Sequence, residues 1–458
     1  MTKPAEYNNT EVAVVGAGPA GLSAAVTAAR SGAQVTLIDN YRQAGGQYYR
    51  QPAAEFQTLN PDSHQREGKD LWEEMTAAGV KVLRETTVWG AFAGNQLALH
   101  GPSSPPGLHA RAIILATGAY ERIAAFPGWT LPGVMTSGAA QTLLKEQRIL
   151  PGRRIVLAGS GPLQLVVAAG LVQAGAEVVA ILEGTPLLRK GLRRPLSYAA
   201  ALWGQWGRLS EGLSSQSTLR RAGVPYHTGW GVLEAHGQDE VTEVTIAQLD
   251  DQWRPIPNTS RRLACDTLCC SYGFIPATEL AQLLGARCEW RPERGGFVPV
   301  RDGRMQTDVP GVYAVGDGAG IGGGPLALIE GQIAGLAAAT QLRAESSNGK
   351  DTAAIVDDDP RLKHALRREQ RFQEVYAELF TPGPGLDELA QPDTVICRCE
   401  EVTRADIGEA VRLGADTLDA VKALTRCGMG NCQGRVCGPL VAALVAQETG
   451  HTRAEVEQ

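Results

Sequence analysis

The feature that most constrains the fold of this 458-residue chain is a strand–turn–helix–strand unit that occurs twice, 143 residues apart. The first copy runs through Glu11–Val15, Gly16-Ala-Gly18-Pro19-Ala20-Gly21, an alanine-rich stretch to Ser31, and Gln34–Asp39. The second copy runs through Arg154–Leu157, Gly159-Ser-Gly161-Pro-Leu-Gln164, a helix to Ala174, and Glu177–Glu183. A crossover helix between two strands favours their parallel pairing, so the repeat predicts two parallel sheets covered by helices.

The glycine turn of the first copy has the composition of a nucleotide site. Gly16 allows a tight turn, Gly18 lets a pyrophosphate approach the backbone, and Gly21 lets the helix pack on the strand. The helix N-terminus, which begins at Pro19 and Ala20, offers free N–H groups and a positive dipole end. Asp39 follows the second strand, where it is placed to accept hydrogen bonds from a ribose. The alternative is an ordinary tight turn, but the whole unit in register favours nucleotide binding.

The second copy departs from this pattern at its third position, Gln164, where glycine or alanine usually permits close packing of helix on strand. Its terminal acid, Glu183, would suit the ribose of NAD and disfavour the phosphate of NADP. Gly159, Gly161 and Glu183 are therefore candidates for a second nucleotide site. Two other interpretations compete with NAD binding: the site binds an adenine nucleotide that takes no part in redox chemistry, or the site is vestigial.

Composition narrows the range of partners and compartments. Lys and Arg number 43 against 49 Asp and Glu, a net charge of −6, which gives no global attraction to nucleic acid. Two uncharged stretches, Val12–Ala29 and Ile155–Ala176, are long enough to mimic membrane spans, but Gly-x-Gly-Pro interrupts each of them early. We expect no transmembrane segment and no signal peptide, and hence a cytoplasmic protein with reduced thiols.

Five of the nine cysteines lie in the last 62 residues. Cys397 and Cys399 form C-x-C, and Cys432 and Cys437 form C-x₄-C after 32 intervening residues. Four thiolates at this spacing can hold a [2Fe–2S] cluster or a structural zinc ion, and C-x-C counts modestly against zinc. The cluster with its thiolates carries net negative charge, which nearby arginines (Arg398, Arg404, Arg426 and Arg435) would offset. No Cys-x-x-Cys follows the first glycine turn, so disulfide-reductase chemistry lacks its dithiol.

Residues outside these motifs carry weaker signals. Cys265, Cys269, Cys270 and Cys288 are expected to be small apolar core residues, with the adjacent pair on opposite faces of a strand. Trp203 and Trp206 are expected in core or interface packing. The histidines lie in no motif.

Further motifs resemble the flavoproteins that have two dinucleotide-binding domains, the family of disulfide reductases and ferredoxin reductases. These motifs are Gly45-Gly46-Gln47, Ala116-Thr117-Gly118, and Thr307-Asp-Val-Pro-Gly-Val-Tyr313-Ala-Val-Gly316-Asp317. The resemblance implies FAD, wrapped at Gly45, Gly46 and Gln47, approached at the Thr117-Gly118 turn, and bound through its ribityl chain by the aspartate after Gly316. A helix after Gly322-Gly-Gly-Pro325 would direct its positive end at the flavin.

The C-terminal segment resembles the small [2Fe–2S] domain of the bacterioferritin-associated ferredoxin type, through Cys-Arg-Cys-Glu and Gly-Met-Gly-Asn-Cys-Gln-Gly-Arg-Val-Cys-Gly. That resemblance implies Cys397, Cys399, Cys432 and Cys437 as ligands. Cys427, in Arg-Cys427-Gly, stands where many relatives have alanine and is interpreted as a non-ligand.

In combination, these parts resemble the large, or A, subunit of hetero-oligomeric amine and amino-acid dehydrogenases, such as opine oxidases and hydrogen cyanide synthase. Tyr-Tyr-Arg-Gln at 48–51 and Ala-Thr-Gly-Ala-Tyr-Glu-Arg at 116–122 add to the match. The resemblance implies an electron-transfer subunit whose partner, an FAD-dependent β subunit, oxidises a secondary amine or amino acid. The resemblance is also compatible with further components: a small ferredoxin-like third subunit, FMN at a subunit interface, and a quinone or other small-molecule acceptor. It is likewise compatible with peripheral association with the inner membrane face. A stand-alone NAD(P)H-dependent reductase and a zinc-bearing scaffold are the alternatives. No general base for substrate oxidation is evident.

The predicted fold class is α/β, with two Rossmann-like domains, the second inserted in the first, and a small, mainly helical C-terminal domain. The predicted boundaries are 1–127 and 268–345 for the FAD domain, 128–267 for the second dinucleotide-type domain, 346–390 for a linker with a helix, and 391–458 for the [2Fe–2S] domain.

Overall fold

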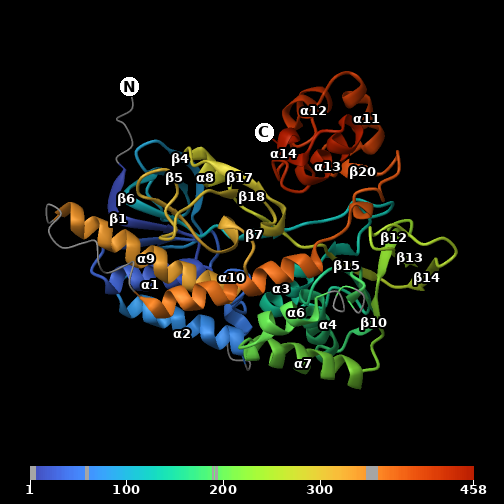
Figure 1. Ribbon diagram of the computed structural model, residues 1–458, viewed down its shortest axis with the longest axis horizontal. Helices are drawn as coiled ribbons and strands as arrows, with labels where there is room; N and C mark the ends of the chain where they lie inside the picture. The colour runs from blue at the N-terminus through green and yellow to red at the C-terminus, as the bar shows by residue number, and fades with distance from the viewer. Residues whose placement is uncertain (1–6, 57–60, 188–189, 191–193, 347–358, 458) are drawn as a thin grey trace. The chain divides into compact units, whose positions relative to one another are not determined.

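The computed structural model describes residues 7–56, 61–187, 190, 194–346 and 359–457 (Figure 1). The chain divides into two compact units. The first unit combines residues 1–120, 145–148 and 274–377, and the second combines 121–144, 149–273 and 378–458. Part of the predicted linker, residues 347–358, lies outside the described residues. The predicted domain boundaries stay predictions.

The elements of the first unit alternate strands and helices. Its strands are β1 (Asn8–Val15), β2 (Val35–Ile38), β3 (Lys81–Leu83), β4 (Thr87–Phe92), β5 (Gln96–His100), β6 (Gly107–Leu115), β7 (Ala119–Glu121, which reaches the second unit), β16 (Phe274–Pro276), β17 (Cys288–Arg291), β18 (Gly296–Pro299) and β19 (Val312–Ala314). Its helices are α1 (Pro19–Arg30), η1 (Ala54–Phe56), α2 (Ser63–Ala77), α8 (Glu279–Leu283), η2 (Pro292–Arg294), η3 (Gly316–Ala319), α9 (Gly324–Ser346) and α10 (Pro360–Phe380), whose last three residues belong to the second unit.

A seven-stranded sheet forms the centre of the first unit, in the order β3-β2-β1-β6-β5-β4, with β19 also paired to β6. Strand β1 pairs in parallel with both neighbours, Val12 opposite Val35 of β2 and Ala112 of β6. Its buried β-branched residues, Val12, Val14 and Val15, explain its central place. Helices α1 and α9 run side by side along this sheet (Figure 1). They approach closely because Gly331 of α9 has no Cβ, which would lie 2.2 Å from the Ala20 carbonyl oxygen.

The second unit contains the repeated strand–turn–helix–strand. Its strands are β8 (Val134–Thr136), β9 (Arg154–Gly159), β10 (Glu177–Glu183), β11 (Tyr226–Thr228), β12 (Trp230–His236), β13 (Glu243–Gln248), β14 (Arg261–Ala264), β15 (Thr267–Ser271), β20 (Val395–Cys397) and β21 (Val402–Thr403). Its helices are α3 (Ser137–Gln147, which ends in the first unit), α4 (Leu163–Gln173), α6 (Pro195–Leu202), α7 (Trp206–Arg221), η4 (Pro384–Leu386), α11 (Arg404–Arg412), α12 (Leu418–Thr425), α13 (Gly438–Thr449) and α14 (Arg453–Val456).

A parallel five-stranded sheet, in the order β11-β10-β9-β15-β8, carries the second glycine turn at the end of β9. An antiparallel sheet, β12-β13-β14, lies in the chain between β11 and β15 of the parallel sheet. Helices α11–α14 with the short hairpin β20-β21 form the C-terminal part. The predicted α/β class, with two dinucleotide-type folds and a mainly helical C-terminal domain, is confirmed by the sheets and helices and by the similarity to known proteins reported below.

Other sequence expectations meet mixed outcomes. Cys269 and Cys270 are buried in different hydrophobic clusters, as expected of neighbours on opposite faces of β15. Trp203 and Trp206 are 76% and 66% exposed, so the core half of that prediction is wrong. Their rings contact each other edge to face at 6.0 Å, outside the core. Among the described residues, no helix is both long and apolar enough to span a membrane.

Candidate functional sites

The first glycine turn connects β1 to α1, and the other predicted FAD motifs contact it. A Cβ added to Gly46 would lie 2.9 Å from the Gly18 Cα, and the Gly45 N–H donates to the Ala17 carbonyl at 2.8 Å. The late motif also reaches it, because a Cβ on Gly316 would lie 2.9 Å from the Ala20 Cβ. The structure therefore brings the separate motifs of the sequence into one place.

The turn itself has the open end that a diphosphate needs. Gly16 has φ +103°, and a Cβ on Gly21 would lie 1.8 Å from the Gly16 carbonyl oxygen, so packing requires glycine at both positions. Gly18 differs, since a Cβ there would meet nothing closer than 3.9 Å. Helix α1 begins after Gly18 with no side-chain cap, and Pro19 stands at its start. The helix thus presents uncapped N–H groups and its positive dipole end, which fits a bound diphosphate.

Asp39 lies just beyond β2, where the sequence predicts a ribose partner. Its carboxylate accepts from the Ala17 N–H at 2.5 Å and from the Tyr41 N–H at 2.7 Å. Burial raises the pKa of this carboxyl, and the two backbone donors oppose that rise. Each carboxylate oxygen has a second lone pair, so these bonds leave capacity for a ribose hydroxyl. Gln47 is exposed, beside the buried Gly45.

Asp317 and the Thr117-Gly118 turn form the other side of this site. The Asp317 carboxylate accepts from the N–H groups of Gly322 and Gly323, both at 2.8 Å, and burial raises its pKa. Gly318 packs on Thr117, because a Cβ added to Gly318 would lie 2.5 Å from the Thr117 Oγ1. The Thr117 hydroxyl in turn donates a hydrogen bond to the Ala277 carbonyl at 2.6 Å. These contacts hold the late motif against the turn, as FAD binding requires.

Sequence reasoning missed a buried ion pair that supports the late motif. Arg301 and Glu330 form two hydrogen bonds, at 2.6 and 3.0 Å, and their side chains are only 10% and 1% exposed. The same Glu330 carboxylate accepts from the Gly316 N–H at 2.8 Å. Glu330 thereby positions the residue that precedes Asp317. The pair joins side chains 29 residues apart, which no local pattern reveals.

We expect Glu330→Ala to destabilise the protein by about 3–5 kcal/mol, because the guanidinium of Arg301 would remain buried without its carboxylate. Denaturant unfolding measures the loss, and FAD content should fall with it. Glu345→Ala in the same helix is the control, since its side chain is 49% exposed and pairs with exposed Arg111. Equal stability of both variants would contradict this role of Glu330.

The second glycine turn connects β9 to α4 and has a different environment. The Glu183 side chain is 1% exposed, and its carboxylate accepts from the Gly161 and Thr185 N–H groups, both at 2.8 Å. Burial raises the pKa of Glu183 to about 7, against the two backbone donors. Glu183 is thus bound to its own turn in the position where the sequence predicts a ribose partner.

This raised pKa predicts a pH dependence of stability. The folded chain keeps a proton on Glu183 that the unfolded chain releases above its ordinary pKa of 4.5, so stability falls as pH rises from about 4.5 to about 7. A shift of this size corresponds to roughly 3 kcal/mol. Glu183→Gln should therefore gain stability relative to the wild type between pH 5 and pH 8, as measured by urea unfolding. Glu177→Gln, on the same strand and exposed, should show no such trend.

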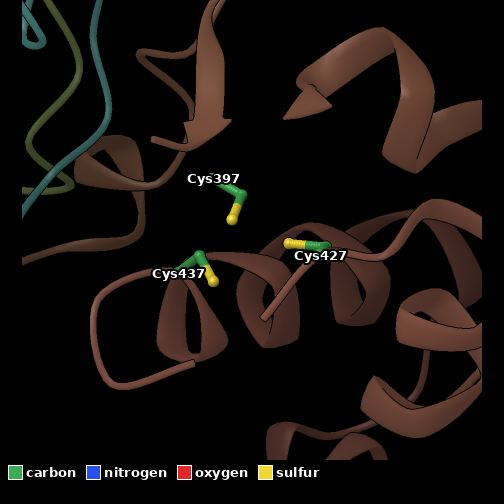
Figure 2. A group of neighbouring side chains, drawn as sticks. All are labelled: Cys397, Cys427 and Cys437. Carbon is green, nitrogen blue, oxygen red and sulfur yellow. The ribbon is translucent and has the colours of Figure 1, made fainter. Parts of the chain in front are cut away.

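The predicted metal centre lies in the C-terminal part, and the structure gathers only some of its cysteines. Cys397 ends β20, Cys437 precedes α13, and their sulfur atoms lie within 4.8 Å of each other and of the Cys427 sulfur. Figure 2 shows the three thiols pointing toward one another. Cys399 is exposed and Cys432 is partly exposed. Cys399 nevertheless contacts the loop of Cys432, because a Cβ on Gly430 would lie 2.2 Å from the Cys399 Cβ.

Two of the inner thiols, Cys427 and Cys437, have pKa values shifted in opposite directions. The hydrogen bond from Cys427, with a further one from Cys397, lowers the pKa of Cys437 to about 6, against the opposing effect of burial. The same interaction with Cys437, together with burial, raises the pKa of Cys427. Among the predicted arginines, Arg426 pairs with Glu400 at 3.0 Å, and Arg398 lies 5.3 Å above the ring of Trp129. Sulfur-only donors suit [2Fe–2S] and zinc alike.

The comparison with protein families favours one of these two metal centres, the [2Fe–2S] cluster or the zinc ion. Residues 10–203 and 214–341 match the family described as pyridine nucleotide-disulphide oxidoreductase. Residues 395–447 match the BFD-like [2Fe-2S] binding domain, which supports the cluster over zinc. Together with the fit of the first turn to a diphosphate, these matches support FAD and a [2Fe–2S] cluster as the cofactors of an FAD-dependent oxidoreductase.

Curated relatives resemble the chain over nearly its whole length. The HcnB subunit of hydrogen cyanide synthase from Pseudomonas aeruginosa is 36% identical over 436 residues, which cover 94% of this chain and 91% of that protein. The A subunit of opine oxidase from Agrobacterium tumefaciens is 32% identical, over 96% of this chain and 86% of that protein. The alpha subunit of sarcosine oxidase from Corynebacterium sp. (strain P-1) is 28% identical over 98% of this chain and 44% of that longer protein.

Solved structures share the fold. L-Proline dehydrogenase from P. horikoshii has a TM-score of 0.66 at 22% identity, covering 99% of this chain and 77% of that one. Thioredoxin reductase of T. acidophilum has a TM-score of 0.54 over 73% of this chain and 99% of that one. Identity and coverage place the chain: it belongs to the family of the HcnB subunit of hydrogen cyanide synthase and the A subunit of opine oxidase, with a pyridine nucleotide-disulphide oxidoreductase fold followed by a BFD-like [2Fe-2S] domain.

Proposed function

We propose that this chain is the electron-transfer subunit of a multi-subunit dehydrogenase. Its partner, an FAD-dependent β subunit, oxidises a secondary amine or amino acid of the opine, proline-derivative, sarcosine or glycine class. The electrons pass through this chain to a quinone or another small-molecule acceptor. The observation that carries the proposal is the presence, in one chain, of an FAD-type fold and a [2Fe-2S] domain, together with full-length similarity to relatives that are named as subunits.

The redox chemistry of amine oxidation explains why one chain would combine a flavin with an iron–sulfur cluster. Oxidation of an amine to an imine releases two electrons and one proton as a hydride, and a second proton. A bound flavin takes two electrons together and can release them singly, and a [2Fe–2S] cluster carries one. In this proposal the uncapped α1 N-terminus would bind the diphosphate of FAD, and Cys397, Cys399, Cys432 and Cys437 would hold the cluster.

The alternative, a stand-alone NAD(P)H-dependent reductase, needs a working second nucleotide site. There Gln164 replaces the usual small residue, and the carboxylate of Glu183 is bound to backbone N–H groups. Both features favour the subunit proposal. We also propose, as extensions of it, a small ferredoxin-like third subunit, FMN at a subunit interface, and a cytoplasmic address with peripheral membrane association.

Purification of the complex from its native source tests the proposal. The chain should co-purify with a second flavoprotein, and the complex should oxidise one member of a panel of opines, proline derivatives, sarcosine and glycine. The separately purified chain, loaded with FAD, is the control and should show no such activity. Oxidation of a substrate by the lone chain at the full rate of the complex would contradict the proposal.

A further inference from the structure

Three consecutive backbone donors of the second glycine turn, the N–H groups of Gly159, Ser160 and Gly161, have partners within the chain. In the orientation that satisfies its hydrogen bonds, the Gln164 side-chain oxygen accepts from the N–H groups of Gly159 and Ser160, at 3.1 and 3.0 Å. Gln164 is 1% exposed. The N–H of Gly161 donates to Glu183, as described above. Glu183 and Gln164 therefore bind the N–H groups of the turn itself, and the Ser160 N–H also donates to the Ser271 carbonyl at 2.8 Å, whereas helix α4 begins without a side-chain cap.

The C-terminal end of α10 covers the same turn. The Ser160 hydroxyl donates to the Phe380 carbonyl at 2.7 Å, and the Lys190 ammonium donates to the Leu379 carbonyl at 3.1 Å. Thr185 donates its hydroxyl to the Leu379 carbonyl at 3.4 Å. The last carbonyls of a helix carry partial negative charge. The end of α10 thus supplies, at this turn, the negative group that a nucleotide phosphate supplies elsewhere.

The chain beyond α10 stays bound along the second unit. Gly385 donates its N–H to the Gln252 carbonyl at 2.9 Å, and a Cβ on Gly385 would lie 2.5 Å from the carbonyl oxygen of Trp253. Arg254 forms two hydrogen bonds with Glu388, at 2.8 and 2.7 Å. These contacts fix the direction in which the chain continues.

A second set of contacts holds the start of the [2Fe–2S] domain. Asp387, 13% exposed, accepts from Arg122 at 3.0 and 3.1 Å and also from Arg453 of α14. The Trp129 indole N–H donates to the Val395 carbonyl, two residues before Cys397, at 2.6 Å. Arg122 and Trp129 belong to the dinucleotide-type part, and Arg453 and Val395 belong to the C-terminal part. Charged and aromatic anchors of this kind are typical of specific interfaces.

We propose that the second dinucleotide-type domain binds no nucleotide and serves as the dock for residues 378–395 and the [2Fe–2S] domain. The end of α10 takes the place of the phosphate, and Gln164 is the residue that decides against a dinucleotide. This assignment goes beyond the proposed function, which needs no second nucleotide but assigns the domain no task.

Calorimetric titration of the FAD-loaded chain tests the first half. We expect no saturable binding of NADH, NADPH or ATP at millimolar concentration. Saturable binding that Gly161→Val abolishes would overturn the inference. NADH that binds but leaves the flavin oxidised would overturn only this inference, whereas NADH that reduces the flavin would also overturn the proposed function.

Hydrogen exchange read by mass spectrometry tests the dock. Amides of residues 378–395 should be protected in the wild type, and Asp387→Asn should speed their exchange at least tenfold. Asp393→Asn, an exposed neighbour, is the matched control. Ser160→Ala, with exposed Ser210→Ala as control, should speed exchange at 379–383 alone, which keeps the test decisive if Asp387→Asn misfolds. Wild-type amides in 378–395 that exchange as fast as a free peptide would overturn the dock.

Discussion

Gly18→Val is expected to give a folded protein that has lost its flavin. A Cβ at Gly18 meets no atom of the chain within 3.9 Å, so the valine costs little in packing. Its methyl groups would instead enter the space in front of the α1 N-terminus, where the diphosphate must approach the backbone. We expect FAD affinity to fall at least 100-fold, about 2.7 kcal/mol. Flavin absorbance of the purified protein and titration with FAD measure the change.

Two further glycine variants sharpen this test. Gly207→Val, at an exposed glycine of α7 with open space around it, should retain full flavin. Gly21→Val should fail to fold, because its Cβ would lie 1.8 Å from the Gly16 carbonyl oxygen. Circular dichroism separates loss of flavin from loss of fold. Wild-type FAD affinity in Gly18→Val would show that the diphosphate does not lie at this turn.

Serine substitution of the cysteines is expected to divide them into two groups. Cys397→Ser, Cys399→Ser, Cys432→Ser and Cys437→Ser should each lower iron from about two per chain to near zero, because a [2Fe–2S] cluster needs four thiolates. Cys427→Ser should keep its iron, since Cys427 lies outside the C-x-C and C-x₄-C pairs that are the proposed ligands. Iron and acid-labile sulfide analysis measure both groups, and Cys288→Ser, far along the chain in β17, is the control.

The three cysteines whose sulfur atoms lie together, Cys397, Cys427 and Cys437, define an alternative ligand set that the same series of variants tests. If Cys427→Ser loses its iron while Cys399→Ser keeps it, the ligands follow this alternative set and our assignment is wrong. One zinc and no sulfide per chain in the wild type would contradict the cluster itself.

The sequence predicts the parts of this protein whose signals are local. Gly16, Gly18 and Gly21 mark β1 and α1, because a tight turn and close packing leave few alternatives to glycine. The spacing of the late cysteines indicates a metal centre for a similar reason. Gln164 already differs from the pattern in the sequence, although its effect on the N–H groups of Gly159 and Ser160 requires the structure.

Contacts between residues far apart in the chain were beyond sequence reasoning. The Ser160 hydroxyl binds a carbonyl 220 residues away, and Trp129 binds one 266 residues away. Ser160 lies in the second glycine turn and Trp129 lies in no motif, but neither periodicity nor spacing links either residue to its distant partner. The exposure of Trp203 and Trp206 was missed because a large aromatic residue is more often buried than exposed.

Anaerobic mixing of the FAD-loaded chain with possible reductants tests the central claim most directly. In a stopped-flow spectrometer, the flavin of the isolated chain should stay oxidised with NADH and with the amine substrate, and should be reduced by dithionite as a control. After addition of the partner protein, the amine alone should reduce it. Rapid bleaching of the isolated chain by NADH would identify a reductase, and bleaching by the amine would identify a substrate-oxidising enzyme. Either result would contradict the assignment of this chain as an electron-transfer subunit.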